Sequence, residues 1–174
     1  MVKLKGLLIK NRIICENNDY ARDLYINKGY GVMVNNNIEL SLIEALYLLK
    51  KGIIEIYDYR NNIVDEKKIL KIGKRNISNF WIKFIVYSDL RDRGYVVKTA
   101  FKFGADFRVY EKGKKVGEEH SKWIVFTSYE HDKVTWQDIA AKNRVAHSTR
   151  KRLLLAVVDD ESNVTYYELK WIRP

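Results

Sequence analysis

The segment Leu153-Leu154-Leu155-Ala156-Val157-Val158 is the longest purely aliphatic run of the chain. It is far shorter than the roughly 20 residues of a membrane-spanning helix, and the polar Asp159-Asp160-Glu161 follows it directly. Such a run is typical of a buried strand. Upstream, Thr135 is expected to cap a helix that runs to about Thr149. Downstream, the aromatic-rich segment 164–172 predicts a second strand, so this part of the chain predicts a mixed sheet with flanking helices.

The residues before this region extend the same pattern toward the N-terminus. Ser78 is expected to cap a helix that ends at Gly94. The core face of this helix is expected to consist of Phe80, Trp81, Phe84, Ile85 and Leu90. Further strands are predicted at 95–103, 106–111 and 123–129. Together these elements predict a C-terminal domain over residues 77–174.

Residues 1–76 predict a separate small domain. Lys3 to Cys15 alternates around Lys10-Asn11-Arg12 and predicts a hairpin. Ser41 and Glu44 have the spacing of a capping box, and the helix that they begin is expected to stop at Gly52. A strand over 53–59 and a helix over 65–75 follow. The expected class is α+β, with no chemical motif in this domain.

Composition narrows the class of protein further. The chain has 174 residues, of which 47% are hydrophobic and 31% charged, which excludes a disordered or low-complexity protein. The single Cys15 excludes an internal disulfide and favours a reducing compartment. Lys3, Lys5 and Lys10 interrupt the first apolar stretch, so no signal peptide is expected. We therefore expect a cytoplasmic protein without a membrane partner.

The net charge of +10 favours a polyanionic partner, although a solvated basic surface would account for it equally well. One segment concentrates this charge: residues 142–152 contain five basic side chains, one histidine and no acid. Cations at a helix C-terminus complement the helix dipole, which would explain Arg150, Lys151 and Arg152. That explanation does not extend to Arg144, a turn and a half earlier, and phosphate contact is the alternative.

The chemistry-bearing residues do not predict a cofactor. His120, His131 and His147 are 11 and 16 residues apart, without the close ligand pairs of a zinc site. No glycine-rich phosphate loop occurs. We therefore expect neither a cofactor nor a metal.

A strand segment carries the second group of candidate residues. On a strand, Asp106, Arg108 and Tyr110 share one face, and His120 follows ten residues after the tyrosine. Taken singly, each of these residues is also typical of an ordinary amphipathic edge or a solvated turn.

Three ordered motifs resemble the archaeal tRNA-splicing endonuclease family. They are Phe103-Gly104-Ala105-Asp106-Phe107 with Tyr110, then His120, then His147-Ser148-Thr149-Arg150-Lys151. The resemblance extends to the segments 40–47 and 89–95 and to the closing strand, and so covers most of the chain. It implies a restriction-nuclease-like topology for the C-terminal domain.

The resemblance implies metal-free attack of a ribose 2′-OH on the adjacent phosphorus, which leaves a 2′,3′-cyclic phosphate and a 5′-OH. Tyr110 would be the general base, His120 the general acid and Lys151 the stabiliser of the developing charge. A tyrosine ionises near pH 10 in water, so a nearby cation such as Arg108 or Lys151 would have to favour the phenolate. The implied substrate is precursor tRNA with bulge–helix–bulge junctions at its intron.

The resemblance also implies residues that bind RNA and assemble subunits. Arg144 would clamp a flipped base, with Tyr166 or Trp171 as its stacking partner, and Arg150 would add a phosphate contact. The acidic turn at Asp159, Asp160 and Glu161 resembles a loop that docks into a basic cleft of another subunit. Paired cuts would need a dimer, a homotetramer, or a heterotetramer with a noncatalytic sister subunit.

Two other functions stay open at this point. A metal-dependent nuclease of the restriction-enzyme type would use Asp106 with Glu111 or Glu119. A noncatalytic RNA-binding subunit would keep the fold, although it would not need to retain Tyr110, His120 and Lys151 together.

Overall fold

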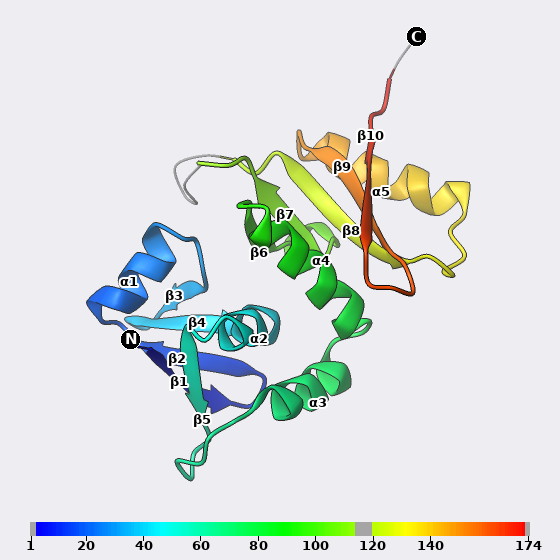
Figure 1. Ribbon diagram of the computed structural model, residues 1–174. Coiled ribbons are helices and arrows are strands. Elements are labelled where there is room, and N and C mark those ends of the chain that lie inside the picture. The colour runs from blue at the N-terminus through cyan, green and yellow to red at the C-terminus, as the bar shows by residue number, and fades with distance from the viewer. Residues whose placement is uncertain (1–2, 114–119, 173–174) are drawn as a thin grey trace. The chain divides into compact units, whose positions relative to one another are not determined.

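A computed structural model describes residues 3–113 and 120–172. The chain divides into two compact units, Met1–Phe84 and Ile85–Pro174 (Figure 1). Each unit contains one mixed five-stranded sheet with helices, which confirms the predicted α+β class. The division falls inside helix α4 (Phe80–Asp92), so the sequence-based limits 1–76 and 77–174 stay predictions. None of the described helices has the length and hydrophobicity to cross a membrane.

The first unit has the sheet order β3-β4-β2-β1-β5, in which only β1 and β5 are parallel. Its elements in chain order are β1 Leu4–Ile9, β2 Arg12–Glu16, α1 Asp19–Ile26, β3 Val32–Val34, β4 Asn37–Ser41, α2 Leu42–Lys50, β5 Ile54–Tyr57 and α3 Glu66–Asn76. The predicted hairpin is confirmed as β1 and β2.

Helix α2 is the buried centre of the first unit. Ser41 caps it, and the Glu44 carboxylate accepts hydrogen bonds from the backbone N–H and the hydroxyl of Ser41, which confirms the predicted capping box. The other oxygen of Glu44 accepts from the Gly31 N–H at 2.9 Å, so this buried acid is fully hydrogen-bonded. The helix is followed by Gly52 at φ +70°, as predicted.

Close packing of Gly73 against Phe80 fixes the end of α3. A Cβ atom at position 73 would lie 2.4 Å from the nearest carbon of the buried Phe80 ring, and both residues are in the first unit. Glycine in a helix is otherwise unfavourable by about 1 kcal/mol relative to alanine. The close approach of the ring therefore explains the glycine.

We predict that Gly73→Ala lowers the free energy of unfolding by about 1 kcal/mol. Overpacking costs about 1–3 kcal/mol, and the better helix propensity of alanine offsets about 1 kcal/mol of it. Denaturant unfolding measures the change. The exposed neighbour Lys74→Ala is the control, with an expected change within about 0.5 kcal/mol. A Gly73→Ala protein as stable as the control would contradict the prediction.

The second unit has the sheet order β10-β9-β8-β7-β6, in which only β8 and β9 are parallel. Its elements after α4 are β6 Val96–Thr99, the 3₁₀ turn Phe101–Phe103, β7 Phe107–Tyr110, β8 Trp123–Tyr129, α5 Trp136–Ser148, β9 Arg152–Val158 and β10 Val164–Leu169. Parallel neighbours need a crossover, and α5 provides it. Thr135 caps α5 through a capping box with Asp138, which confirms the predicted helix start.

Helices α4 and α5 cover opposite faces of this sheet. Phe107 packs against Tyr87 of α4, with ring centroids 5.8 Å apart. The pleat directs the next residue, Arg108, to the other face. On that face Ile124 and Leu153 join Ala146 of α5 in a buried apolar cluster. The register pairs Arg108 with Ile124 and Ile124 with Leu153, so Arg108 lies in this row.

Three local predictions were wrong. The strand predicted over 95–103 ends at Thr99, because the chain turns back at buried Ala100, whose carbonyl accepts from the Phe103 N–H at 2.8 Å. Trp81, predicted in the core, is 40% exposed. Helix α4 begins at Phe80 and follows Asn79 at φ +52°, so the predicted start at Ser78 is too early.

Candidate active site

The three segments that carry Tyr110, His120 and Lys151 meet at one end of strands β7, β8 and β9. The Lys122 N–H donates to Val109 O at 2.9 Å, and the Arg152 N–H donates to Lys122 O at 2.9 Å. The ammonium of Lys151 donates to Ser121 O at 3.3 Å, next to His120. Segments 10 and 31 positions apart in sequence are thereby hydrogen-bonded to one another.

Tyr110 is the last residue of β7 and is only 3% exposed. It shares its strand face with Arg108, whose guanidinium carbon lies 6.0 Å from the centroid of the tyrosine ring. Asp106 anchors the start of β7, because one of its carboxylate oxygens accepts from the N–H and the hydroxyl of Thr127 at 2.8 and 2.9 Å. The register of β7 on β8 therefore fixes where the tyrosine lies.

His120 and Lys151 differ in their surroundings. His120 is exposed, whereas the next residue, Ser121, is buried and holds the backbone in place. Lys151 is half-buried, and burial lowers the pKa of its ammonium, with a smaller contribution from the positive charge of Arg108. A bound anion would relieve both effects, because it would pair with the lysine in a partly desolvated setting.

The end of α5 sets the position of Lys151. The Arg150 N–H donates to His147 O at 3.0 Å and the Lys151 N–H to Ala146 O at 2.8 Å, the two bonds of a Schellman motif. Arg150 occupies the left-handed position of this motif, at φ +56°, where glycine is usual. A non-glycine residue there carries strain of about 1 kcal/mol or more.

We predict that Arg150→Gly stabilises the protein by up to about 1 kcal/mol, since it removes this strain. Thermal unfolding measures the change, and Arg150→Ala is the control that also removes the charge but keeps a Cβ. Equal stability of the glycine and alanine variants would contradict the prediction.

The residues expected to stack on RNA lie on different faces of the sheet. Arg144 is exposed on α5, and three residues further His147 packs edge-on against Trp171 at 4.7 Å between ring centroids. Tyr166 instead donates its hydroxyl to Asp89 of α4 at 2.7 Å, and burial together with this acceptor raises the pKa of its phenol. The structure therefore brings Trp171, and not Tyr166, toward the helix of Arg144.

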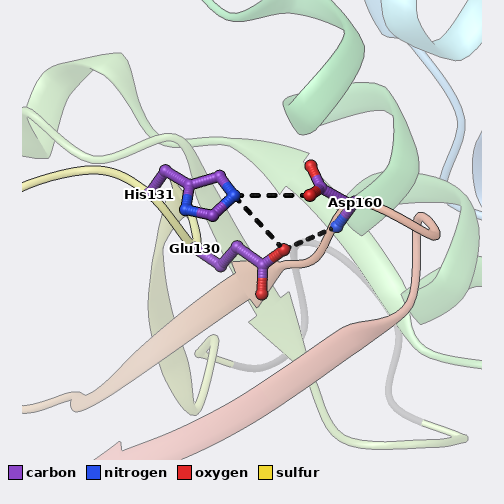
Figure 2. Close-up of side chains that lie close together, drawn as sticks. All are labelled: Glu130, His131 and Asp160. Atoms are coloured by element: carbon purple, nitrogen blue, oxygen red, sulfur yellow. Dashed lines mark hydrogen bonds and ion pairs between the residues drawn. The ribbon is translucent and has the colours of Figure 1, made fainter.

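The acidic turn between β9 and β10 is held in a defined shape. Asp159 accepts from the Asn163 N–H at 2.8 Å, and this bond contributes most to lowering the pKa of its carboxyl. Asp160 accepts from the hydroxyl of Tyr129, and its N–H donates to Glu130 at 2.8 Å. Figure 2 shows Glu130 and His131 directed toward Asp160, with His131 Nε2 3.3 Å from its carboxylate. Glu161 is exposed.

The acids of a metal-dependent nuclease are engaged elsewhere. Asp106 is bonded to Thr127, and Glu111 forms an ion pair with Lys122. Glu119 lies outside the described residues. Within the described ranges, the one group of three possible metal ligands is Glu130, His131 and Asp160. It contains none of the acids expected for a metal-dependent nuclease.

Sequence reasoning missed the contacts that hold the site together. Ser121 acts through its backbone carbonyl, and Thr127 is 21 residues from Asp106. Neither contact has a signal in residue type or spacing. The arrangement of a tyrosine, a histidine and a lysine at one end of a mixed sheet, in a basic chain, indicates a nuclease.

Comparison with known proteins identifies the kind of nuclease. Residues 4–70 match the model of the tRNA intron endonuclease N-terminal domain, and residues 80–166 match that of the catalytic C-terminal domain. A tRNA-splicing endonuclease of Pyrococcus abyssi is 43% identical over 163 residues, which are 94% of this chain and 93% of the relative. One of Methanothermobacter thermautotrophicus is 39% identical over 173 residues, 99% and 100% of the two chains.

The chain therefore belongs to the tRNA-splicing endonuclease family. It carries the catalytic domain of a tRNA intron endonuclease, and the predicted family and enzyme class are confirmed. The restriction-nuclease-like topology and the roles of the individual site residues stay predictions.

Proposed function

We propose that the chain cleaves precursor tRNA at bulge–helix–bulge junctions by metal-free attack of the 2′-OH. The observation that carries this proposal is the hydrogen-bonded meeting of the segments of Tyr110, His120 and Lys151 at the ends of β7, β8 and β9. A base, an acid and a cation, placed at one end of neighbouring strands, are the three groups that this reaction needs.

In the proposed step the 2′-oxygen forms a bond to phosphorus while the bond from phosphorus to the 5′-oxygen breaks. Tyr110, as phenolate, takes the proton of the 2′-OH, and His120, as imidazolium, gives a proton to the departing 5′-oxygen. The products are a 2′,3′-cyclic phosphate and a 5′-OH. Each proton has a donor and an acceptor, and no water enters the step.

Lys151 would stabilise the negative charge that grows on the non-bridging oxygens. Its ammonium is half-buried and fixed on Ser121 O. Preorganised cations in such a setting act more strongly than in water, because they need little rearrangement during the reaction. Burial has already lowered the lysine pKa, so the charged form gains from a bound phosphate.

Substrate recognition is proposed to use the exposed face of α5. Bases released from bulges stack on aromatic or guanidinium planes, and Arg144 with Trp171 offers both kinds of plane. Arg150 adds a cation between Arg144 and Lys151. Tyr166 is the weaker candidate, since its hydroxyl is bonded to Asp89 on the other face.

Assembly is proposed to depend on the acidic turn, with a dimer, a homotetramer or a heterotetramer containing a noncatalytic sister subunit as the alternatives. Asp160 is 66% exposed in its side chain although its backbone is anchored. A rigid, exposed acidic turn suits insertion into a basic surface of another subunit.

We predict that Asp160→Asn with Glu161→Gln shifts the assembly toward smaller species, because two of the docking charges are lost. Light scattering after size-exclusion chromatography measures the mass. Asp138→Asn is not a suitable control because Asp138 caps α5, so the exposed Asp19→Asn serves instead. An unchanged mass in the double variant would remove the docking role.

The purified chain incubated with a bulge–helix–bulge RNA in excess EDTA tests the proposed function. Cyclic phosphate and 5′-OH ends are expected. Loss of cleavage in EDTA, restored by Mg²⁺, would instead favour the metal-dependent alternative. A chain that binds this RNA but cleaves it neither with nor without metal would indicate the noncatalytic subunit.

A further inference from the structure

Arg108, in the candidate active site, carries a buried polar atom that no group within the described residues satisfies. Its Nε is buried and lacks a hydrogen-bond partner, a property that only Ser88 Oγ shares among the described side chains. Guanidinium is charged at every physiological pH. The residue as a whole is half-buried, and a buried polar atom without a hydrogen-bond partner is costly. An arginine in this state indicates a ligand that accepts a hydrogen bond from its guanidinium.

Two cations lie close to Arg108. Lys98 lies directly opposite it on β6 and is buried. The positive charge of Arg108 also contributes to lowering the pKa of Lys151. Asp106, two residues before it, gives a carboxylate oxygen to Thr127.

This concentration of positive charge is directed toward the proposed reaction centre. Arg108 and Tyr110 occupy alternate positions on one strand face, with the guanidinium carbon 6.0 Å from the ring centroid. Lys151 precedes β9, on the face where Leu153 and Ile124 continue the row of Arg108. An anion bound beside Tyr110 and Lys151 would lie within the reach of an arginine side chain.

We propose that Arg108 binds a non-bridging oxygen of the scissile phosphate, together with Lys151. The inference rests on the proposed function and adds a fourth catalytic residue to it. The phosphate satisfies the guanidinium and offsets the repulsion between the two cations. Arginine suits this role because its planar fork matches two phosphate oxygens.

The competing explanation is structural: Arg108 would only pack its stem and contact the Tyr110 ring. The two roles differ in their dependence on the charge of the phosphate. A contact with the phosphate loses its value when the phosphate is neutral, whereas a packing role does not change.

The test compares Arg108→Gln and Arg108→Met with the wild-type protein. Both lose the charge, and the methionine keeps much of the apolar stem. Single-turnover cleavage of the bulge–helix–bulge RNA is expected to slow about 10²-fold, and Arg108→Lys is expected to recover about tenfold of that loss. Lys133→Gln, an exposed lysine in the loop before α5, is the matched control and should cleave at the wild-type rate.

The decisive measurement is binding of two uncleavable RNAs. Both carry a 2′-deoxy sugar at the cleavage site, and one has a neutral methylphosphonate there. The wild-type preference for the charged RNA is expected to fall about tenfold in the Arg108 variants, the value of a charge-assisted hydrogen bond. Lys133→Gln should keep the full preference.

An unchanged preference in a folded Arg108 variant would overturn the proposal. Unfolding of all three Arg108 variants at the assay temperature would also overturn it, since the side chain would then be structural. Failure of the wild-type protein to cleave in EDTA would count against the proposed function instead, and the binding comparison would still report on Arg108.

Discussion

His120→Ala is expected to slow cleavage of the natural phosphodiester by about 10²- to 10⁴-fold, the usual value of a general acid. The same variant is expected to cleave an RNA with a sulfur in place of the bridging 5′-oxygen at close to the wild-type rate. A thiolate leaves without a proton, so this substrate needs no acid. His120 is exposed, and its loss should leave the free energy of unfolding within about 0.5 kcal/mol of the wild type.

Lys151→Ala provides the contrast. Charge on the non-bridging oxygens develops with either leaving group, so this variant is expected to slow both substrates, by about 10²- to 10³-fold. The slowing caused by Lys151→Ala should be at least as large with the sulfur substrate as with the natural phosphodiester. If His120→Ala were equally slow on both RNAs, the histidine would have a role other than proton donation.

The elements whose signals are local were predicted from the sequence. The capping box at Ser41, the helix cap at Thr135 and the stop at Gly52 are confirmed, because each depends on residues within one helical turn. Strands β8 and β9 are confirmed for a related reason. Each contains a short apolar run, 123–126 and 153–158, and such runs favour a buried strand.

Elements that depend on distant partners were missed. Helix α1 is short, begins at Asn18 and buries only two of its residues, Ala21 and Leu24. Strand β4 begins at the last of three consecutive asparagines and is stabilised by β2, whose sequence lies more than twenty positions away. Local propensity is weak in both, and tertiary pairing decides them.

The candidate site shows the same division. The residue types of Tyr110, His120 and Lys151 were accessible through ordered motifs, whereas their meeting depends on the register of β7, β8 and β9. The burial of Arg108 Nε and the contact of Lys151 with Ser121 O belong to the assembled sheet. A pattern of residue types carries no information on either.

Tyr110→Phe is expected to lower the single-turnover rate about 10²-fold or more near neutral pH, where an RNA 2′-OH needs a base. The phenyl ring keeps the packing of a side chain that is 3% exposed, so the fold is retained and the loss belongs to the hydroxyl. Tyr95→Phe is the matched control. Its ring lies 5.9 Å from that of Trp123, and removal of its hydroxyl should leave the rate unchanged.

The pH dependence separates a base from a hydroxyl that only positions the substrate. With the 5′-sulfur RNA, which needs no proton from His120, hydroxide from solvent must ionise the 2′-OH in Tyr110→Phe, so the rate should rise about tenfold per pH unit while the RNA stays stable. The wild-type rate should rise less steeply, and the two profiles should approach each other at alkaline pH. A positioning role predicts parallel profiles instead.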